Sequence, residues 1–283
     1  SAIRSYRQQV ESRVFPSSEH CWELSPKIVK TFNEELGLKE KDSAKPVESR
    51  RIVVVGGGAM GTLFASRLSE RGHKVVVISK WRKHAEEINS NNCNLKTSDG
   101  KVNYSAKFNV CETSIEAKEV LGGLADYALI LTKSNKTKEA ALVAAKVLNS
   151  SGFVLTLQNG IGNDKVLEET FGKRTLKGIS YQSAFCDKPG SVVSSSYDAP
   201  SFIASANLSE EATFAVTELC NIVPELKKVS LSDFEDIARE KLFVNAVVNV
   251  LTAVYKVKNG ELLESAYRPV LSALTSEVSC VLE

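Results

Sequence analysis

The stretch Arg51-Ile-Val-Val-Val-Gly-Gly-Gly-Ala-Met-Gly61 decides the fold of this chain. A run rich in β-branched residues leads directly into a glycine cluster, in which Gly56, Gly58 and Gly61 are spaced G-x-G-x-x-G. In a dinucleotide fingerprint the first glycine makes a tight turn and the second lets the backbone approach a pyrophosphate. The third lets the following helix pack closely on the strand.

The residues after the cluster supply the context that such a glycine pattern needs. Residues 62–71 have helical apolar spacing, Gly72 ends that helix, and a second apolar run covers 75–78. Strand, glycine turn, helix and strand within about 30 residues predict a dinucleotide site, with the pyrophosphate at the helix N-terminus beside Ala59 and Met60. A glycine-rich turn that binds nothing is the alternative.

The end of the second apolar run indicates which dinucleotide is bound. A site that prefers NAD usually carries Asp or Glu about 20 residues after the glycines, where it binds the ribose 2′-hydroxyl. Here the window reads Ile78-Ser79-Lys80-Trp81-Arg82-Lys83 and contains no acid. A basic, hydroxyl-bearing loop suits a 2′-phosphate, so we expect NADPH. A solvated basic loop is the alternative.

The bulk composition is that of a globular protein with one large or two ordinary domains. The chain has 283 residues, 43% of them hydrophobic, and a net charge of +2, which gives no indication of nucleic-acid binding. No apolar run approaches the roughly 20 residues of a membrane span. The six cysteines and three histidines are dispersed, which predicts reduced thiols and no metal site.

Residues 1–50 precede the fingerprint, and we expect an N-terminal extension and linker. The first of them are rich in arginine, like the remainder of an organellar presequence, which predicts a mitochondrial or other organellar location. An ordinary basic tail on a cytoplasmic protein is the alternative. Residues 25–37 have the apolar stripe of a helix that docks on the body or on a partner. Charged residues 39–48 then form a linker.

Two further strands place polar residues where ligands collect. The apolar run at 127–132 ends at Lys133, and the run at 153–157 leads into Gln158-Asn159-Gly160. In a doubly wound sheet, ligands bind outside the carboxyl ends of the strands. Lys133 and Asn159 are therefore expected where a nicotinamide and its substrate meet.

The remaining pattern predicts an α/β chain with two domains after the extension. Helices are expected at 84–89 and 139–148, a hairpin turn at Ser98-Asp99-Gly100, and further strands between 175 and 205 around Pro189-Gly190. From Ser209 onward the pattern becomes helical, with helices at 210–223, 235–257 and 269–283 and a capping box at Ser232 to Glu235. We therefore expect a Rossmann-type, NADP-binding domain over 51–206 and an all-helical domain for substrate and dimerisation over 207–283.

One face of the second helix in that half carries three polar residues. Lys241, Asn245 and Asn249 lie at i, i+4 and i+8 among apolar neighbours, so we expect them on one side and partly buried. Such groups need hydrogen-bond partners, which a bound keto acid would supply. A structural polar network within the core is the alternative.

These motifs, in this order, resemble the ketopantoate reductases (2-dehydropantoate 2-reductases) from residue 51 to the end. The most specific part is the block Lys241-Leu-Phe-Val-Asn245-Ala-Val-Val-Asn249-Val-Leu-Thr-Ala, followed by Asn259-Gly260-Glu261-Leu262. The resemblance implies reduction of 2-dehydropantoate with NADPH, a step towards coenzyme A in pantothenate biosynthesis. A related 2-keto acid would be reduced to its 2-hydroxy acid in the same way.

The resemblance also implies roles for single residues. Lys241 would polarise the ketone and deliver a proton, and Asn245, Asn249 and Asn259 would hold the oxygens of the substrate. The remaining residues would contact the cofactor: Asn159 together with the substrate, Lys133 near the reacting centre, and Lys80 at the 2′-phosphate. A buried cationic donor is what hydride addition to a ketone needs, because an alkoxide develops there.

The sequence departs from the family at two places. Lys136 stands where the family commonly has Gln, which adds charge beside the cofactor. The family also continues with helices that carry a substrate-contacting Ser and a catalytic Glu, whereas this sequence ends at Glu283. We therefore expect either that the natural chain continues or that it binds NADPH and reduces ketopantoate poorly. The alternative function is an inactive NADP-binding subunit of a homo-oligomer or larger assembly, held through residues 1–50 and the C-terminal helices.

Overall fold

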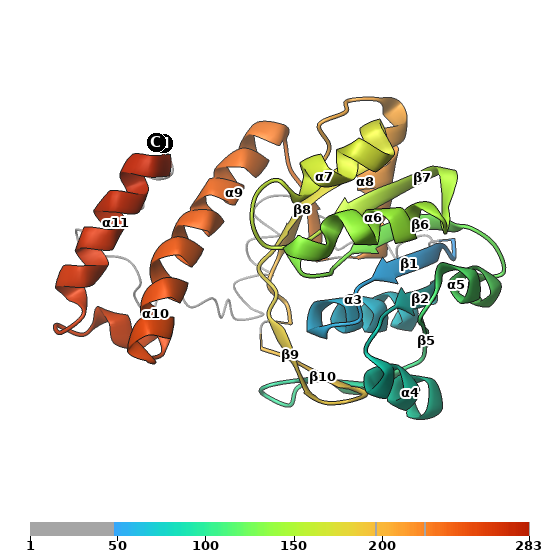
Figure 1. Ribbon diagram of the computed structural model, residues 1–283, viewed down its shortest axis with the longest axis horizontal. Helices are drawn as coiled ribbons and strands as arrows, with labels where there is room; N and C mark the ends of the chain where they lie inside the picture. Colours follow the sequence, from blue (N-terminus) through green and yellow to red (C-terminus); the bar gives the residue numbers. More distant parts are fainter. Residues whose placement is uncertain (1–47, 196, 224, 283) are drawn as a thin grey trace, which may run out of the picture. The chain divides into compact units, whose positions relative to one another are not determined.

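The computed structural model describes residues 48–195, 197–223 and 225–282 (Figure 1). The helix predicted at 25–37, almost all of the predicted linker, the arginine-rich start and Cys21 lie outside these residues. The described chain divides into two compact units, Glu48–Ala238 and the segment from Arg239 onward. The division falls inside helix α9 (Leu231–Val244).

An eight-stranded sheet forms the centre of the first unit, with strand order β12-β11-β8-β7-β6-β1-β2-β5. Neighbouring strands are parallel except for β8 and β11, which pair antiparallel. The strands are β1 (Arg51–Val55), β2 (Lys74–Ile78), β5 (Asn109–Cys111), β6 (Ala125–Ile130), β7 (Leu148–Thr156), β8 (Thr175–Ser180), β11 (Ser201–Ala204) and β12 (Leu226–Lys228). This is the predicted doubly wound architecture.

Both faces of the sheet are covered by helices, as the apolar run of β1 requires. Ile52 and Val54 pack with α3 (Ala59–Glu70) and α8 (Glu210–Ile222) on one face. Val53 and Val55 pack on the other with α5 (Ser114–Leu121), α6 (Thr137–Ala145) and α7 (Asn163–Phe171). The core of the first unit is therefore two apolar layers, one on each side of β1.

A second, four-stranded sheet has the order β4-β3-β10-β9. Its strands are β3 (Cys93–Thr97), β4 (Asn103–Ala106), β9 (Ala184–Lys188) and β10 (Ser191–Ser194), and α4 (Arg82–Asn91) precedes it. The predicted turn at Ser98-Asp99-Gly100 joins β3 to β4, where Asp99 Oδ1 accepts from the Lys101 N–H at 3.1 Å. Pro189-Gly190 joins β9 to β10. Both turn predictions are confirmed.

The predicted boundary near residue 207 falls inside the first unit, between β11 and α8. The reason is strand β12, which was not predicted from the sequence. It pairs in parallel with β11, with Ser201 opposite Leu226, so α8 is the crossover helix of one more parallel strand pair.

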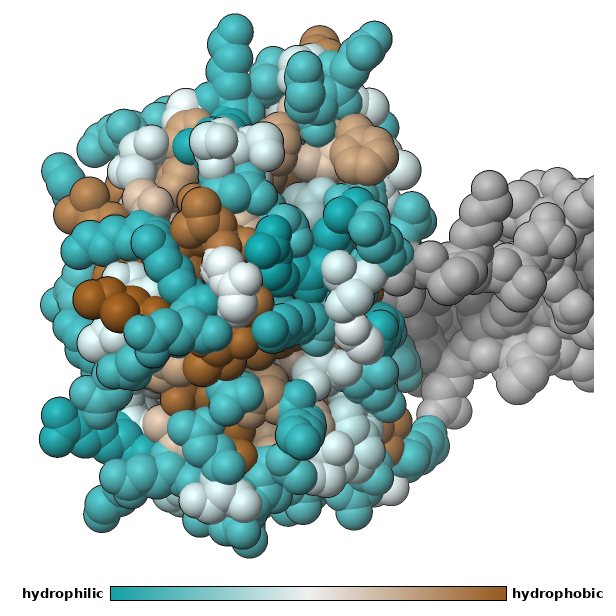
Figure 2. All heavy atoms as spheres, turned by 90° about the vertical axis from the view of Figure 1, so that its right-hand side faces the viewer, coloured by the Kyte–Doolittle hydropathy of each residue, from teal (hydrophilic) through white to brown (hydrophobic). Residues whose placement is uncertain are grey.

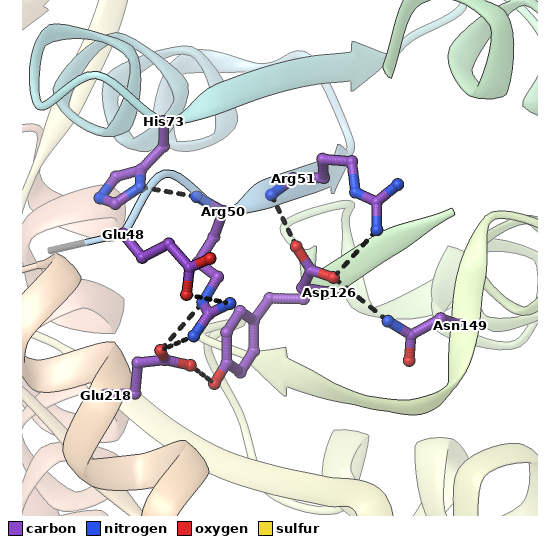
Figure 3. A network of polar contacts seen from close by, with 8 residues as sticks. Glu48, Arg50, Arg51, His73, Asp126, Asn149 and Glu218 are labelled. Atoms are coloured by element: carbon purple, nitrogen blue, oxygen red, sulfur yellow. Dashed lines mark hydrogen bonds and ion pairs between the residues drawn. The ribbon is translucent and has the colours of Figure 1, made fainter. Parts of the chain in front are cut away.

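The chain enters β1 through a polar network at the amino ends of the strands (Figure 3). Arg50 Nη2 lies 2.6 Å from Glu218 Oε1, and the Tyr127 hydroxyl donates to the other oxygen of Glu218. The Arg51 N–H donates to Asp126 Oδ2 at 2.9 Å. These bonds join the start of β1, the start of β6 and helix α8 at the edge of the sheet opposite the carboxyl ends.

The second unit is helical. It contains the end of α9, a π-helical turn η4 (Asn245–Asn249), α10 (Val250–Tyr255), η5 (Asn259–Leu263) and α11 (Arg268–Leu282). Phe243, Val247, Leu251 and Leu262 form its small core. The helix predicted to continue to about 257 is confirmed, with a π turn inside it that was not predicted, and Lys256, with φ +57°, ends it.

The predicted capping box is wrong by two residues. The Asp233 N–H donates to Ser230 Oγ at 3.1 Å, so Ser230 caps α9 and Ser232 already lies in the first turn. A cap must precede the first helical residue to reach the unpaired N–H groups, and Ser230 does so.

The face of the first unit where α5 lies is mainly hydrophilic, and hydrophobic atoms show between the hydrophilic side chains, mostly near the middle of the face (Figure 2). Among the described residues no helix is both long and apolar enough to cross a membrane.

Candidate dinucleotide-binding site

A cleft of roughly 950 Å³ lies at the carboxyl ends of β1, β6 and β7. All of its lining residues belong to the first unit. They include seven of the eight predicted cofactor residues, namely Gly56, Gly58, Ala59, Met60, Lys80, Lys133 and Asn159. The eighth, Gly61, is buried behind the turn.

The glycine turn shows why only glycine fits at two of the three motif positions. Gly56 has φ +116°, and a Cβ there would lie 2.6 Å from the backbone nitrogen of Thr132. A Cβ on Gly61 would lie 1.8 Å from the carbonyl oxygen of Gly56. The turn therefore packs against β6, and α3 packs against the turn, as the fingerprint predicts.

The N-terminus of α3 is open to the cleft. Gly58 is its N-cap, no side chain caps it, and its first turn contains no acid. A Cβ on Gly58 would meet no atom within 4 Å, so a ligand can approach its backbone. The first N–H groups of a helix lack partners within it and attract an anion. This end of the cleft fits a pyrophosphate.

The basic loop after β2 is paired with acids that the sequence window does not contain. Lys80 Nζ lies 2.5 Å from Glu139 Oε1, and Arg82 Nε lies 2.7 Å from Glu112 Oε1. Lys136 Nζ also contacts Glu139, at 3.3 Å. Neither glutamate could be predicted from the sequence, since Glu139 and Glu112 lie 59 and 30 residues from their partners and no local pattern signals them.

His84 packs against this loop through Trp81. Its ring stacks on Trp81 with 4.4 Å between centroids, and it is fully buried. The Gly190 N–H donates to His84 Nδ1 at 3.0 Å, so the proton of the neutral ring sits on Nε2 and is donated to Thr62 Oγ1. Burial lowers the pKa of His84. The neutral ring thus joins α3, α4 and the β9–β10 turn.

Gln158 holds the ends of β6 and β7 together. Its Nε2 donates to the carbonyl oxygen of Thr132 at 2.8 Å, and its Oε1 accepts from Thr156 Oγ1 at 2.9 Å. These bonds fix the backbone just before Lys133 and Asn159, whose side chains are exposed at the cleft. This role of Gln158 was not predicted, although Gln158 directly precedes Asn159 in the sequence.

The other predicted site residues belong to the second unit. Lys241 is half-buried, and burial lowers the pKa of its ammonium group. Asn249 Nδ2 donates to Asn245 Oδ1 at 3.0 Å, so these two amides share one side of the π turn, as predicted. Asn245 is partly buried, as predicted, whereas Asn249 is exposed. Asn259 is exposed at the start of η5.

No group of metal-ligating side chains occurs among the described residues. The five cysteines within them are free thiols.

The fold and the cleft define a Rossmann-type dinucleotide-binding protein. Two sequence families match the chain: Ketopantoate reductase PanE/ApbA over residues 52–203, and Ketopantoate reductase PanE/ApbA C terminal over residues 233–283. The chain belongs to the ketopantoate reductase family.

Similar proteins agree with this assignment. A 2-dehydropantoate 2-reductase of Pyrococcus horikoshii is 30% identical over 220 residues, which cover 77% of this chain and 68% of the relative. One of Listeria monocytogenes is 25% identical, covering 82% and 75%.

Two solved structures share the fold. The 2-dehydropantoate 2-reductase of Geobacter metallireducens has a TM-score of 0.70 at 22% identity, covering 82% of this chain and 75% of that one. A D-mandelate dehydrogenase with NADH and anilino(oxo)acetate has a TM-score of 0.69 at 23% identity, covering 82% and 73%.

Proposed function

We propose that this protein reduces 2-dehydropantoate, or a related 2-keto acid, to the 2-hydroxy acid with NADPH. The single observation that carries the proposal is the cleft, where an uncapped helix N-terminus, a basic loop and Asn159 line one cavity. Family membership supplies the substrate class. No observation favours the alternative of an inactive subunit.

Different residues of the cleft bind different parts of the cofactor. The backbone of Gly58, Ala59 and Met60 binds the pyrophosphate, and Lys80 binds the 2′-phosphate. Lys133 and Asn159 hold the nicotinamide end. When bound, the nicotinamide supplies the hydride that adds to the carbonyl carbon of the keto acid.

Lys241 supplies the proton. The carbonyl oxygen gains negative charge as its carbon is reduced, and a cationic donor stabilises that charge and protonates the oxygen. Burial brings the pKa of Lys241 down towards the range in which an ammonium group is an effective general acid. The oxygens of the substrate bind the amide groups of Asn245, Asn249 and Asn259. These contacts fix the position of the substrate carbonyl relative to the ammonium group of Lys241.

We expect NADPH rather than NADH because three cations, Lys80, Arg82 and Lys136, lie near the end of β2 and are paired with only two carboxylates, those of Glu112 and Glu139. The similar D-mandelate dehydrogenase was solved with NADH, so the fold alone does not set this preference. Titration calorimetry with both cofactors tests it. A charge-assisted contact with a phosphate contributes about 1.5–3 kcal/mol, so Lys80→Ala should weaken NADPH binding roughly tenfold or more. NADH binding should not change, and equal affinities in the unmodified protein would refute the preference.

A further inference from the structure

Gln182 is a buried residue to which neither the sequence motifs nor the proposed function assigns a role. It lies between the end of β8 and the start of β9, lines the cleft, and is 7% exposed. Its backbone N–H donates to Ser180 Oγ at 3.1 Å. Within the described part of the chain, neither Nε2 nor Oε1 of its side chain has a hydrogen-bond partner.

A buried amide without partners is unfavourable, because both of its polar atoms lose water and gain nothing in return. Gln158, at the end of the neighbouring strand, shows the contrasting case. Its Nε2 and Oε1 both bond protein groups, namely Thr132 and Thr156. Gln158 is therefore structural, whereas the amide of Gln182 has a donor and an acceptor left for a ligand.

The sheet order places Gln182 at the reacting end of the cleft. The glycine turn follows β1 and the basic loop follows β2, whereas β8 lies on the opposite side of β1, beyond β6 and β7. Along that direction Lys133 follows β6, Asn159 follows β7 and Gln182 follows β8. A dinucleotide with its pyrophosphate at Gly58 and its 2′-phosphate at Lys80 extends its nicotinamide towards Asn159 and Gln182.

We propose that the side chain of Gln182 binds the carboxamide of the nicotinamide. The two groups are both primary amides, so Gln182 Nε2 donates to the carboxamide oxygen while Gln182 Oε1 accepts from the carboxamide nitrogen. This pairing satisfies both buried atoms at once and fixes the rotation of the ring in the cleft. The inference rests on the proposed function, because it requires a nicotinamide cofactor, and it makes Gln182 a positioning residue for that cofactor.

The test compares NADP⁺ with its 3-acetylpyridine analogue, in which a methyl group replaces the carboxamide NH₂. Calorimetry measures both dissociation constants for the unmodified protein, Gln182→Leu and Lys80→Ala. The unmodified protein should prefer NADP⁺ by about 3- to 10-fold, which corresponds to one neutral hydrogen bond. Gln182→Leu should reduce this ratio to near one. Lys80→Ala, a change at the opposite end of the cleft, should leave the ratio as it is.

Thermal unfolding without ligand provides the second readout. Leucine has a similar volume and carries no polar atoms, so Gln182→Leu should keep or raise Tm. A ratio that Gln182→Leu leaves unchanged would overturn the inference, whatever happens to Tm. If the unmodified protein bound neither dinucleotide, the proposed function would fail first, and with it the inference that rests on it.

Discussion

Lys80 and Glu139 form an ion pair at the mouth of the cleft, with 2.5 Å between Nζ and Oε1. The two residues come from the loop after β2 and from α6, 59 positions apart in the sequence. Lys136 contacts the other oxygen of Glu139 at 3.3 Å. One carboxylate therefore pairs with both lysines, and we expect this pairing to lower the affinity of the free protein for the 2′-phosphate that we assign to Lys80.

Replacing this carboxylate should tighten NADPH binding. Glu139→Gln removes the competitor for Lys80 and Lys136 and the repulsion between carboxylate and phosphate. The side chains are largely exposed, so the gain in affinity should be modest, roughly fivefold at most. NADH affinity should change little. Calorimetry at low salt measures both, and Lys136→Gln is the opposite control, which should weaken NADPH alone. An equal effect of Glu139→Gln on both cofactors would contradict this account.

The buried ring of His84 should make stability depend on pH. Burial lowers the pKa of His84 below its ordinary 6.5. The unfolded chain therefore takes up a proton near pH 6.5, whereas the folded protein takes it up only at lower pH. Stability is fully present above pH 6.5 and falls as the pH drops below it.

Comparison with His84→Asn isolates this contribution. Asparagine keeps an acceptor for the Gly190 N–H but does not titrate, so the variant should lose less stability between pH 7 and pH 5. It should be less stable at pH 7, by about 1–3 kcal/mol, because Thr62 loses its partner. The lowered pKa of His73 acts in both proteins and cancels in the difference. If the curves of unfolding free energy against pH were parallel for the unmodified protein and His84→Asn, the assignment of His84 as a buried, neutral ring would be contradicted.

The network at the amino ends of the strands should contribute to stability and not to binding. Glu218→Gln weakens the contact with Arg50 and leaves the Tyr127 hydroxyl a neutral acceptor. We expect the free energy of unfolding to fall by about 1–3 kcal/mol. Denaturant unfolding measures this, and Glu119→Gln on the exposed side of α5 should have almost no effect. NADPH affinity should be the same in both variants. A marked loss of NADPH affinity in Glu218→Gln would contradict this prediction, because it would show that the network at this edge of the sheet also affects binding in the cleft.

The sequence predicts the parts of the fold that depend on neighbouring residues. The path from β1 through Gly56 and Gly61 to α3 follows from local requirements, because Gly56 has a positive φ and Gly61 packs against the carbonyl oxygen of Gly56, although Gly56 also lies against the distant Thr132. The ends of β6 and β7 follow from apolar runs that stop at Lys133 and Gln158. These elements bring most of the predicted cofactor residues to one cleft.

The features that the sequence does not predict depend on distant partners. β12 has three residues and is a strand only because β11 pairs with it. Glu112 and Glu139 reach the basic loop from other elements, so the local window looks free of acid. The π turn at Asn245–Asn249 has the same apolar pattern as an α-helix. Ser230 and Ser232 are both serines that could cap a helix. Which of them caps α9 depends only on where the first helical turn begins.

The most direct test of the central claim follows the hydride itself. The protein is loaded with NADPH that carries two deuterium atoms at C4, ketopantoate is added, and the hydroxy acid is analysed by mass spectrometry. Even slow turnover leaves label, so the result does not depend on a high rate. We predict one deuterium at C2 of the hydroxy acid. In Lys241→Ala its formation should be slower by roughly 10² to 10⁴, with NADPH affinity unchanged. Bound NADPH with no deuterium in the hydroxy acid, or transfer that Lys241→Ala does not slow, would contradict the account.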